Sequence, residues 1–340
     1  MLNFKSDFSE FITGFYLKQF THLNTQEREH VLETLGVTPS AINEFITSED
    51  IYITLPHASM NVFFPRAGVS RYVYDLQNSN KNAFHLRFFL THTNFSDLNW
   101  RPYAWWFNNG GKIDKLTFDK LTFFTRNKKK KHNIVYSLKP NEMHSASVDR
   151  RLRHDFDTSM KFKRISLSFI YMTAVQEVNS GFAHKGRTLY LPLDAFVAFI
   201  IHQAKNDVIS FNFLEAFLSQ AQCRRLNGEE LSFTSEWRDA FIFDNFTNIA
   251  LLNFFQPAAF VGGEKMDNYW HQVIEKWKMA LPNQSEVEFA LPTNLVMPAV
   301  QEYIYPYKPS SDIAEQLIKN NIPYSLTMAI QEHDLFSKKE

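Results

Sequence analysis

A run of basic side chains near the middle of the chain has the chemistry to bind a polyanion. It consists of Arg126, Lys128, Lys129, Lys130 and Lys131. Strand-forming residues flank the run on both sides, which favours the tip of a β-hairpin. Adjacent lysines repel one another, and binding to a phosphate backbone relieves this repulsion while it releases counterions. A solvated turn without any ligand is an equally good interpretation when the run is considered by itself.

The distribution of charge along the chain strengthens the first interpretation. The 340 residues contain 36 Lys and Arg against 36 Asp and Glu, so the formal net charge is zero. Residues 112–187 nevertheless carry 17 basic and 7 acidic side chains, while the remainder carries 19 and 29. A neutral protein that separates its charges in this way presents a positive surface, for which nucleic acid is the usual partner.

A second basic element follows the lysine run. Residues 147–161 predict a helix in which Leu152, Phe156 and Met160 mark a buried side, with basic side chains on the opposite side. Lysines there would follow phosphates, and an arginine would also reach guanine. The alternative is a solvated helix face whose charges pair with Asp155 and Asp157. With a basic turn at 184–187 included, the predicted nucleic-acid contacts are Arg126, Lys128, Lys129, Lys130, Lys131, Lys139, Arg150, Arg151, Arg153, Lys161, Lys163, Arg164, Lys185 and Arg187.

Aromatic side chains gather just before the basic segment, at Trp100, Tyr103, Trp105 and Trp106. Exposed rings of this kind stack on unpaired bases. Aromatics make up 16% of the chain, so core packing is the favoured interpretation of this cluster and a stacking platform is the alternative.

Signatures of catalysis are largely absent from the sequence. It has no P-loop, no HExxH and no GxSxG, and no carboxylate-x-Lys pattern after an apolar strand. The spacing Arg126-Asn127-x4-His132 loosely resembles the RN-x(4–6)-H motif of HEPN ribonucleases, a resemblance that implies action on the 2′-hydroxyl and the scissile phosphate. HEPN domains are helical, whereas the residues that flank this motif predict strands.

The single cysteine, Cys223, excludes an internal disulfide and a cysteine-based zinc site. A small buried residue is the favoured interpretation of Cys223, and a nucleophile is the alternative. The first residues lack the pattern of a signal peptide. The longest apolar run, 195–201, is much shorter than the roughly 20 residues of a membrane span. We therefore expect a soluble, cytoplasmic protein.

The elements that must position these groups predict an α+β fold. We expect helices over 1–50, an aromatic-rich region with mostly antiparallel strands, a basic hairpin and a basic helix over 51–190, and a mainly helical region over 191–340. Strands rich in β-branched and aromatic residues are expected at 51–55, 70–74, 83–90, 116–118, 121–124, 132–138 and 165–171. Further helices are expected at 194–204, 211–226, 235–256, 265–280 and 311–320.

The N-terminal region contains clear helix boundaries. Asn24 and Glu27 resemble a capping box, Gly36 is a plausible helix end, and Thr38-Pro39 supplies a new N-cap. Residues 31–45 resemble a helix-turn-helix, which would imply DNA reading. The stretch between Asn24 and Asp50 has one basic and six acidic residues, however. A helical bundle or a protein-docking module is therefore favoured.

These observations predict a protein of prokaryotic or phage origin that binds nucleic acid, either DNA or RNA, and needs no cofactor. One alternative is a divergent metal-dependent nuclease of the restriction or phage-defence type, which would use Mg²⁺. Another is a protein-interaction or structural subunit, whose basic surface binds an acidic partner or which forms a homodimer through its acidic helical regions. None of these interpretations involves a membrane.

Overall fold

The computed structural model describes residues 4–57, 65–93, 104–109, 112–118, 134–135, 143–145, 150–179, 182–205, 212–228, 230–263, 266–281 and 290–296. Within these ranges the chain is an α+β mixture, as the sequence predicts. No helix in the described ranges is long and apolar enough to cross a membrane.

The chain begins with three helices whose ends follow the predicted signals. They are α1 (Phe4–Gln19), α2 (Thr25–Leu35) and α3 (Pro39–Thr47). The side chains of Asn24 and Thr38 accept hydrogen bonds from backbone N–H groups of the helices that they precede. Gly36 ends α2 with φ +81°, and a Cβ at this position would lie 2.1 Å from the carbonyl oxygen of Thr188. Only glycine therefore fits this turn.

A parallel five-stranded sheet, sheet A, forms the centre of the molecule. Its strands are β1 (Asp50–His57), β2 (Ala83–Phe89), β8 (Thr188–Pro192), β12 (Ala259–Gly262) and β13 (Asn294–Val296). They lie in the order β13-β12-β1-β2-β8. In chain order, β2 and β8 are added on one side of β1, and β12 and β13 are then added on its other side. This is the doubly wound order of α/β proteins, with its reversal between β1 and β12.

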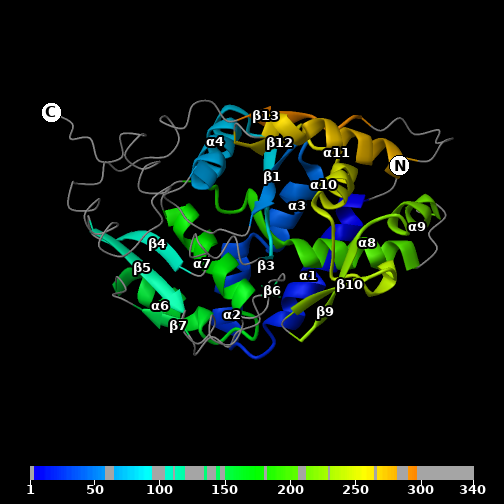
Figure 1. Ribbon diagram of the computed structural model, residues 1–340. Helices are drawn as coiled ribbons and strands as arrows, with labels where there is room; N and C mark the ends of the chain where they lie inside the picture. The colour runs from blue at the N-terminus through cyan, green and yellow to red at the C-terminus, as the bar shows by residue number, and fades with distance from the viewer. Residues whose placement is uncertain are drawn as a thin grey trace.

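Helices cover both faces of sheet A. On one face lie α4 (Pro65–Ser79) and α7 (Ile165–Asn179), and on the other lie α1, α3 and α8 (Leu193–Lys205). Figure 1 shows β1 between these two groups of helices. The C-terminal part of the described chain adds α10 (Asn245–Leu252), the short helix η5 (Asn253–Phe255) and α11 (Asp267–Ala280).

Two smaller sheets are antiparallel, as expected for most strands of this chain. Sheet B has the order β11-β9-β10-β6-β3, and sheet C has the order β4-β5-β7. The strands of sheet B are β11 (Ile242–Phe243), β9 (Cys223–Asn227), β10 (Glu230–Thr234), β6 (Ile134–Val135) and β3 (His92–Thr93). Those of sheet C are β4 (Ala104–Asn109), β5 (Lys112–Phe118) and β7 (Met143–Ser145).

Two predicted strands are helices in the structure. Residues 70–74 belong to α4, whose Val69 and Val73 pack one helical turn apart against Val261 of the sheet. Residues 165–171 belong to α7, where Ser166 and Ser168 alternate with apolar residues and imitate a strand. Residues 166–171 are all buried in α7, and a helix that is enclosed on every side loses its amphipathic pattern.

The predicted helices at 211–226 and 235–256 are shorter than expected. The first is α9 (Asn212–Leu218) followed by strand β9, and the second contains η4 (Trp237–Asp239), β11, α10 and η5. Asn227-Gly228 is a typical hairpin turn, and Gly228 has φ +63°. The helix at 147–161 is present as α6 (Arg150–Ser159). The predicted strand at 121–124 and helix at 311–320 lie outside the described residues.

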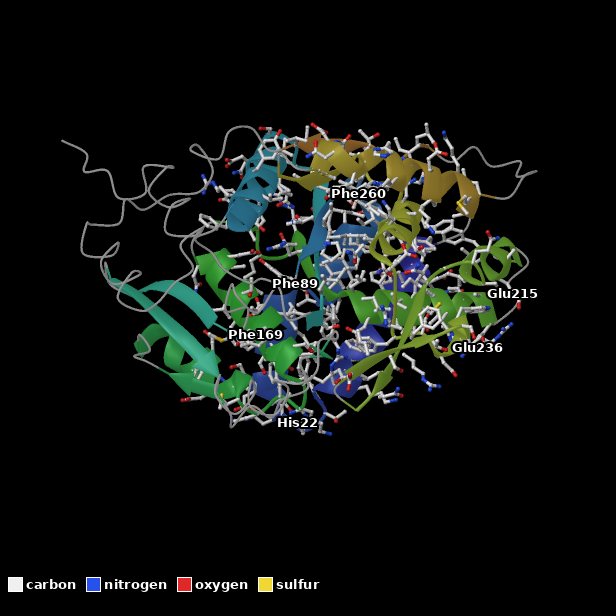
Figure 2. All side chains as sticks on the ribbon, viewed as in Figure 1. His22, Phe89, Phe169, Glu215, Glu236 and Phe260 are labelled. Carbon is white, nitrogen blue, oxygen red and sulfur yellow. The ribbon has the colours of Figure 1, made fainter. Side chains whose placement is uncertain are left out.

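Side chains fill the space between sheet A and its helices (Figure 2). Phe89, Phe169 and Phe260 are buried in this interior, whereas His22, Glu215 and Glu236 are exposed at the periphery. Sheet A takes strands from both sides of residue 190, so one core is shared by the regions before and after this residue.

Candidate nucleic-acid interface and polar face of the sheet

The structure locates part of the predicted basic surface. Arg126, Lys128, Lys129, Lys130, Lys131 and Lys139 lie outside the described residues, as do Trp100 and Tyr103. Arg150, Arg151 and Arg153 are in α6, as expected, although their side chains are not among those described.

Four of the predicted contacts bind other parts of the chain. Lys161 forms an ion pair with Glu27 of α2. Nη2 of Arg164 lies 2.9 Å from Oδ2 of Asp194. Nζ of Lys185 lies 2.9 Å from Oε1 of Glu33, and Arg187 donates a hydrogen bond of 3.1 Å to the carbonyl oxygen of Gln77.

These contacts differ in how firmly they hold the cation. Lys161 and Lys185 are exposed, and exposed ion pairs contribute about 0–1 kcal/mol, so both lysines can exchange partners at low cost. The Arg164–Asp194 pair is better shielded from water. Lys163 has an exposed side chain. Lys161, Arg164 and Lys185 therefore pair within the chain, with Glu27, Asp194 and Glu33 and not with Asp155 or Asp157.

The hairpin of β9 and β10 presents a basic and aromatic surface that sequence reasoning missed. Phe233 is 62% exposed, and the guanidinium carbon of Arg224 lies 6.0 Å from the centre of its ring. Arg224 and Phe233 are cross-strand partners, and Arg225 and Leu226 are also exposed. The interpretation of 211–226 as a helix concealed this arrangement, although Asn227-Gly228 is a signal for the hairpin.

Sheet B connects this hairpin to the predicted basic segment. Strand β6 pairs with β10 through Ile134 and Glu230. Ile134 follows Lys131 by three residues in the chain. The strand that succeeds the lysine run is therefore hydrogen-bonded to the strand that carries Phe233.

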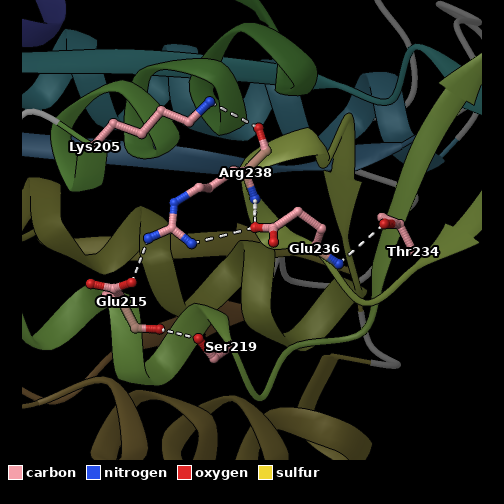
Figure 3. A network of polar contacts seen from close by, with 6 residues as sticks. All are labelled: Lys205, Glu215, Ser219, Thr234, Glu236 and Arg238. Carbon is pink, nitrogen blue, oxygen red and sulfur yellow. Dashed lines mark hydrogen bonds and ion pairs between the residues drawn. The ribbon is translucent and has the colours of Figure 1, made fainter.

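A polar network holds the base of the hairpin to the neighbouring helices (Figure 3). Arg238 of η4 contacts the carboxylates of Glu215 and Glu236, and Nζ of Lys205 donates a hydrogen bond of 3.1 Å to the carbonyl oxygen of Arg238. The backbone N–H of Glu236 donates to Oγ1 of Thr234, the last residue of β10. Arg238 is thus committed to a structural role, and Arg224 is the cation next to Phe233.

A surface hollow of about 500 Å³ lies between α1 and α8. Asp7, Glu10, Phe11 and His202 are among its lining residues. Two carboxylates at this site repel phosphate groups, so the hollow is a poor candidate for nucleic-acid binding.

A second candidate site is the face of sheet A that α4 and α7 cover. Arg87 of β2 is 3% exposed, and its Nη2 lies 3.1 Å from Oε1 of Glu177, which comes from α7 and is 1% exposed. Oγ of Ser70, in α4, donates a hydrogen bond of 3.1 Å to the same carboxylate oxygen. Burial, and secondarily the charge of Glu177, hold the pKa of the Tyr190 phenol well above its usual value.

His85 belongs to the same polar face. Its Nε2 lies 2.5 Å from Oγ1 of Thr54 on β1. Burial lowers the pKa of His85 well below its usual value, and the nearby Arg87 charge lowers it further. The imidazole is therefore neutral in the folded protein at neutral pH, and it can donate or accept one hydrogen bond at each nitrogen according to its tautomer.

Several buried atoms of this polar face lack hydrogen-bond partners among the described residues. They include Nη1 of Arg87, Oε2 of Glu177 and Nδ1 of His85. A buried polar atom without a partner costs about 1–3 kcal/mol. The Arg87–Glu177 pair lies near the carboxyl end of β2, and ligands of doubly wound sheets bind outside the carboxyl ends of their strands.

Other expected chemistry receives less support. Cys223 is buried, and desolvation raises the pKa of its thiol to about 11, so the thiolate needed by a nucleophile is scarce at neutral pH. The favoured interpretation, a buried small residue, is confirmed. Within the described ranges, no group of three or more His, Cys, Asp or Glu side chains is arranged to hold a metal ion.

Comparison with known proteins found no matching family model, no matching curated protein and no matching solved structure.

Proposed function

We propose that this protein binds nucleic acid by electrostatic attraction, through the basic segment 112–187. Lys128, Lys129, Lys130 and Lys131 would bind phosphates together with the arginines of α6. The excess of ten basic over acidic side chains in this segment supports the proposal. The ion pair of Arg164 with Asp194 narrows the predicted surface, because it is better shielded from water than the exposed pairs of Lys161 and Lys185.

The observation that supports the proposal most is the pairing of β6 with β10 in sheet B. It joins the strand after the lysine run to a hairpin that carries two arginines and an exposed phenylalanine. Two sources of positive charge, distant in sequence, are thereby connected through one sheet. The segment between β2 and β8 also leaves sheet A at the carboxyl end of β2, the edge at which doubly wound proteins bind their ligands.

The decisive variant replaces Lys128, Lys129, Lys130 and Lys131 together by alanine. Affinity for DNA and RNA would be measured by fluorescence anisotropy over a range of salt concentrations. The logarithm of the affinity falls with the logarithm of salt by about 0.9 for each phosphate contact to duplex DNA. Loss of four contacts therefore lowers the slope by about 3–4 and weakens binding at low salt.

A matched control removes the same amount of charge elsewhere. Lys18, Lys81, Lys276 and Lys278 lie outside the basic segment, and their joint replacement by alanine should leave the slope nearly unchanged. Equal effects of the two quadruple variants would show that only net charge matters. An unchanged affinity of the first variant would contradict the assignment of the lysine run.

A second candidate function is hydrolysis of nucleic acid with a divalent metal ion. The observation in its favour is the order of sheet A, whose reversal between β1 and β12 places a candidate ligand site at the carboxyl edge. Incubation of bound DNA or RNA with Mg²⁺ and with EDTA separates the two candidates. Degradation in Mg²⁺ alone would establish an enzyme, and intact nucleic acid in both conditions would leave binding as the activity.

A further inference from the structure

Phe233 is unusual among the large apolar side chains because it is in a strand within a sheet and is nevertheless 62% exposed. Its neighbours Leu231 and Thr234 in β10 are buried and anchor the strand to the core. Strand β9 pairs with β11 as well as β10, and β10 pairs with β6 as well as β9. Phe233 itself pairs with Arg224 of β9, whereas the pairing with β6 lies at Glu230. The ring is therefore displayed on a paired strand, which holds its position better than a loop would.

The immediate surroundings of the ring are basic. Arg224 lies opposite Phe233 in the hairpin, with its guanidinium carbon 6.0 Å from the ring centre. This contact orients the arginine by a cation–π attraction. Arg225 is exposed in the same strand, and Nε of this residue lies 3.4 Å from Oγ of Ser232. Arg225 pairs with Ser232 and therefore points to the other face of the hairpin, so Arg224 is the cation beside the ring. A planar apolar ring with a guanidinium group next to it fits a ligand that has both flat rings and negative charge.

We propose that Phe233 stacks on an unpaired base of a single-stranded nucleic acid, and that Arg224 binds a phosphate next to that base. The inference rests on the proposed function and adds to it a class of substrate. Single strands expose the faces of their bases, whereas the bases of a duplex are already stacked on one another. Stacking on aromatic side chains is also tolerant of sequence, because every base has a π face.

The connectivity of sheet B favours nucleic acid over an acidic protein as the occupant. The hairpin is paired with β6, which follows the lysine run by three residues. A polymer with a regular spacing of phosphates can contact both regions, and its bases give the ring a partner. The acidic residues at the base of the hairpin, Glu215 and Glu236, share Arg238 as their ion-pair partner, which offsets one of their two negative charges.

The test compares three substitutions at one position, in the full-length protein. Phe233→Ala removes the ring, Phe233→Leu keeps an apolar side chain without a π face, and Phe233→Trp keeps an aromatic ring. Binding of a 20-nucleotide oligo(dT), an oligo(U) of the same length and a 20-base-pair DNA duplex would be measured by fluorescence anisotropy. Leu226→Ala, at another exposed apolar position of the same hairpin, serves as the control.

Stacking of one base predicts that Phe233→Ala weakens single-strand binding by roughly 5- to 150-fold. Phe233→Leu should be nearly as weak, and Phe233→Trp should bind as well as the unmodified protein. Duplex affinity and the salt dependence should change little, because the phosphate contacts remain. The Leu226→Ala protein should behave like the unmodified one.

The outcomes separate this inference from the proposed function. If the unmodified protein binds single strands and Phe233→Ala binds them equally well, the stacking site is overturned and electrostatic binding stands. If Phe233→Leu restores full affinity, the contact is merely apolar and stacking is overturned. If the unmodified protein binds no nucleic acid but captures an acidic polypeptide such as poly-glutamate, both proposals are overturned.

Discussion

The two faces of sheet A are both buried, yet they are built from opposite chemistry. On one face, the apolar side chains of β2 meet phenylalanine rings from the helices. Phe84 contacts Phe45, and Phe88 contacts Phe196 and Phe255, with ring centroids 5.3–6.5 Å apart. Leu86 of β2 lies on the same face. On the other face, Arg87 of the same strand meets Glu177, which also accepts a hydrogen bond from Ser70, and His85 meets Thr54. Alternate side chains of one strand thus point into two buried regions, one apolar and one polar.

The two faces differ in their effect on stability: buried aromatic side chains stabilise the fold, whereas buried charges cost free energy of desolvation. Burial of an aromatic side chain contributes stability through the area that it removes from water. A buried ion pair seldom repays the desolvation of its two charges. The polar face therefore adds little net stability.

The largest effect is expected on the apolar face. Phe255 of η5 contacts the rings of Phe4, Phe8, Phe45 and Phe196 at centroid distances of 4.9–6.0 Å. Phe255→Ala should lower the free energy of unfolding by about 3–5 kcal/mol, because it leaves a cavity among rings that cannot close over it. Urea denaturation measures this loss. The same substitution at exposed Phe233 should cost less than about 0.5 kcal/mol, and similar losses at the two positions would contradict this account.

The next effect tests the polar face. Arg87→Met leaves Glu177 buried without its cation, and removal of one partner from a buried pair costs about 3–5 kcal/mol. The double variant Arg87→Met, Glu177→Leu removes both charges and should regain most of this loss. Urea denaturation of the single and double variants completes the comparison. A double variant as unstable as Arg87→Met would show that the pair itself stabilises the fold.

The sequence predicts the elements of this fold better than their arrangement. The capping residues Asn24, Gly36 and Thr38 mark helix ends that the structure confirms, because these signals act within a few residues. Strands β1 and β2 are also predicted. The parallel sheet to which they belong is not, because it also joins β1 to β12 across about two hundred residues, and local periodicity contains no information on such contacts.

The polar face of sheet A was even harder to predict from local sequence patterns. Arg87 and Glu177 are separated by 90 residues in the chain, and neither differs in sequence from an ordinary surface residue. Phe233 was concealed for another reason: the segment before it was interpreted as a helix, although Asn227-Gly228 predicts a turn. The charge excess of residues 112–187 was visible because it depends on composition alone.

The smallest effect concerns His85 and the pH dependence of stability. Burial and the charge of Arg87 hold the pKa of this imidazole well below its usual value of about 6.5. Below pH 6.5 the unfolded chain binds a proton at His85 and the folded chain does not, so protonation favours unfolding. The neutral state of His85 contributes fully to the free energy of unfolding above pH 6.5. This contribution is lost as the pH falls from 6.5 towards the lower pKa of His85 in the folded protein, with a slope of up to about 1.4 kcal/mol per pH unit.

His85→Gln removes this titration and keeps a side chain that can hydrogen-bond to Thr54. Its stability at pH 7.5 should be within about 1–3 kcal/mol of the unmodified protein, and its stability should decline less steeply between pH 6.5 and 5. His271→Gln, on the exposed side of α11, provides the matched control. If the two variants have the same pH dependence, His85 is protonated in the folded state, and the polar face is then more open to water than its burial indicates.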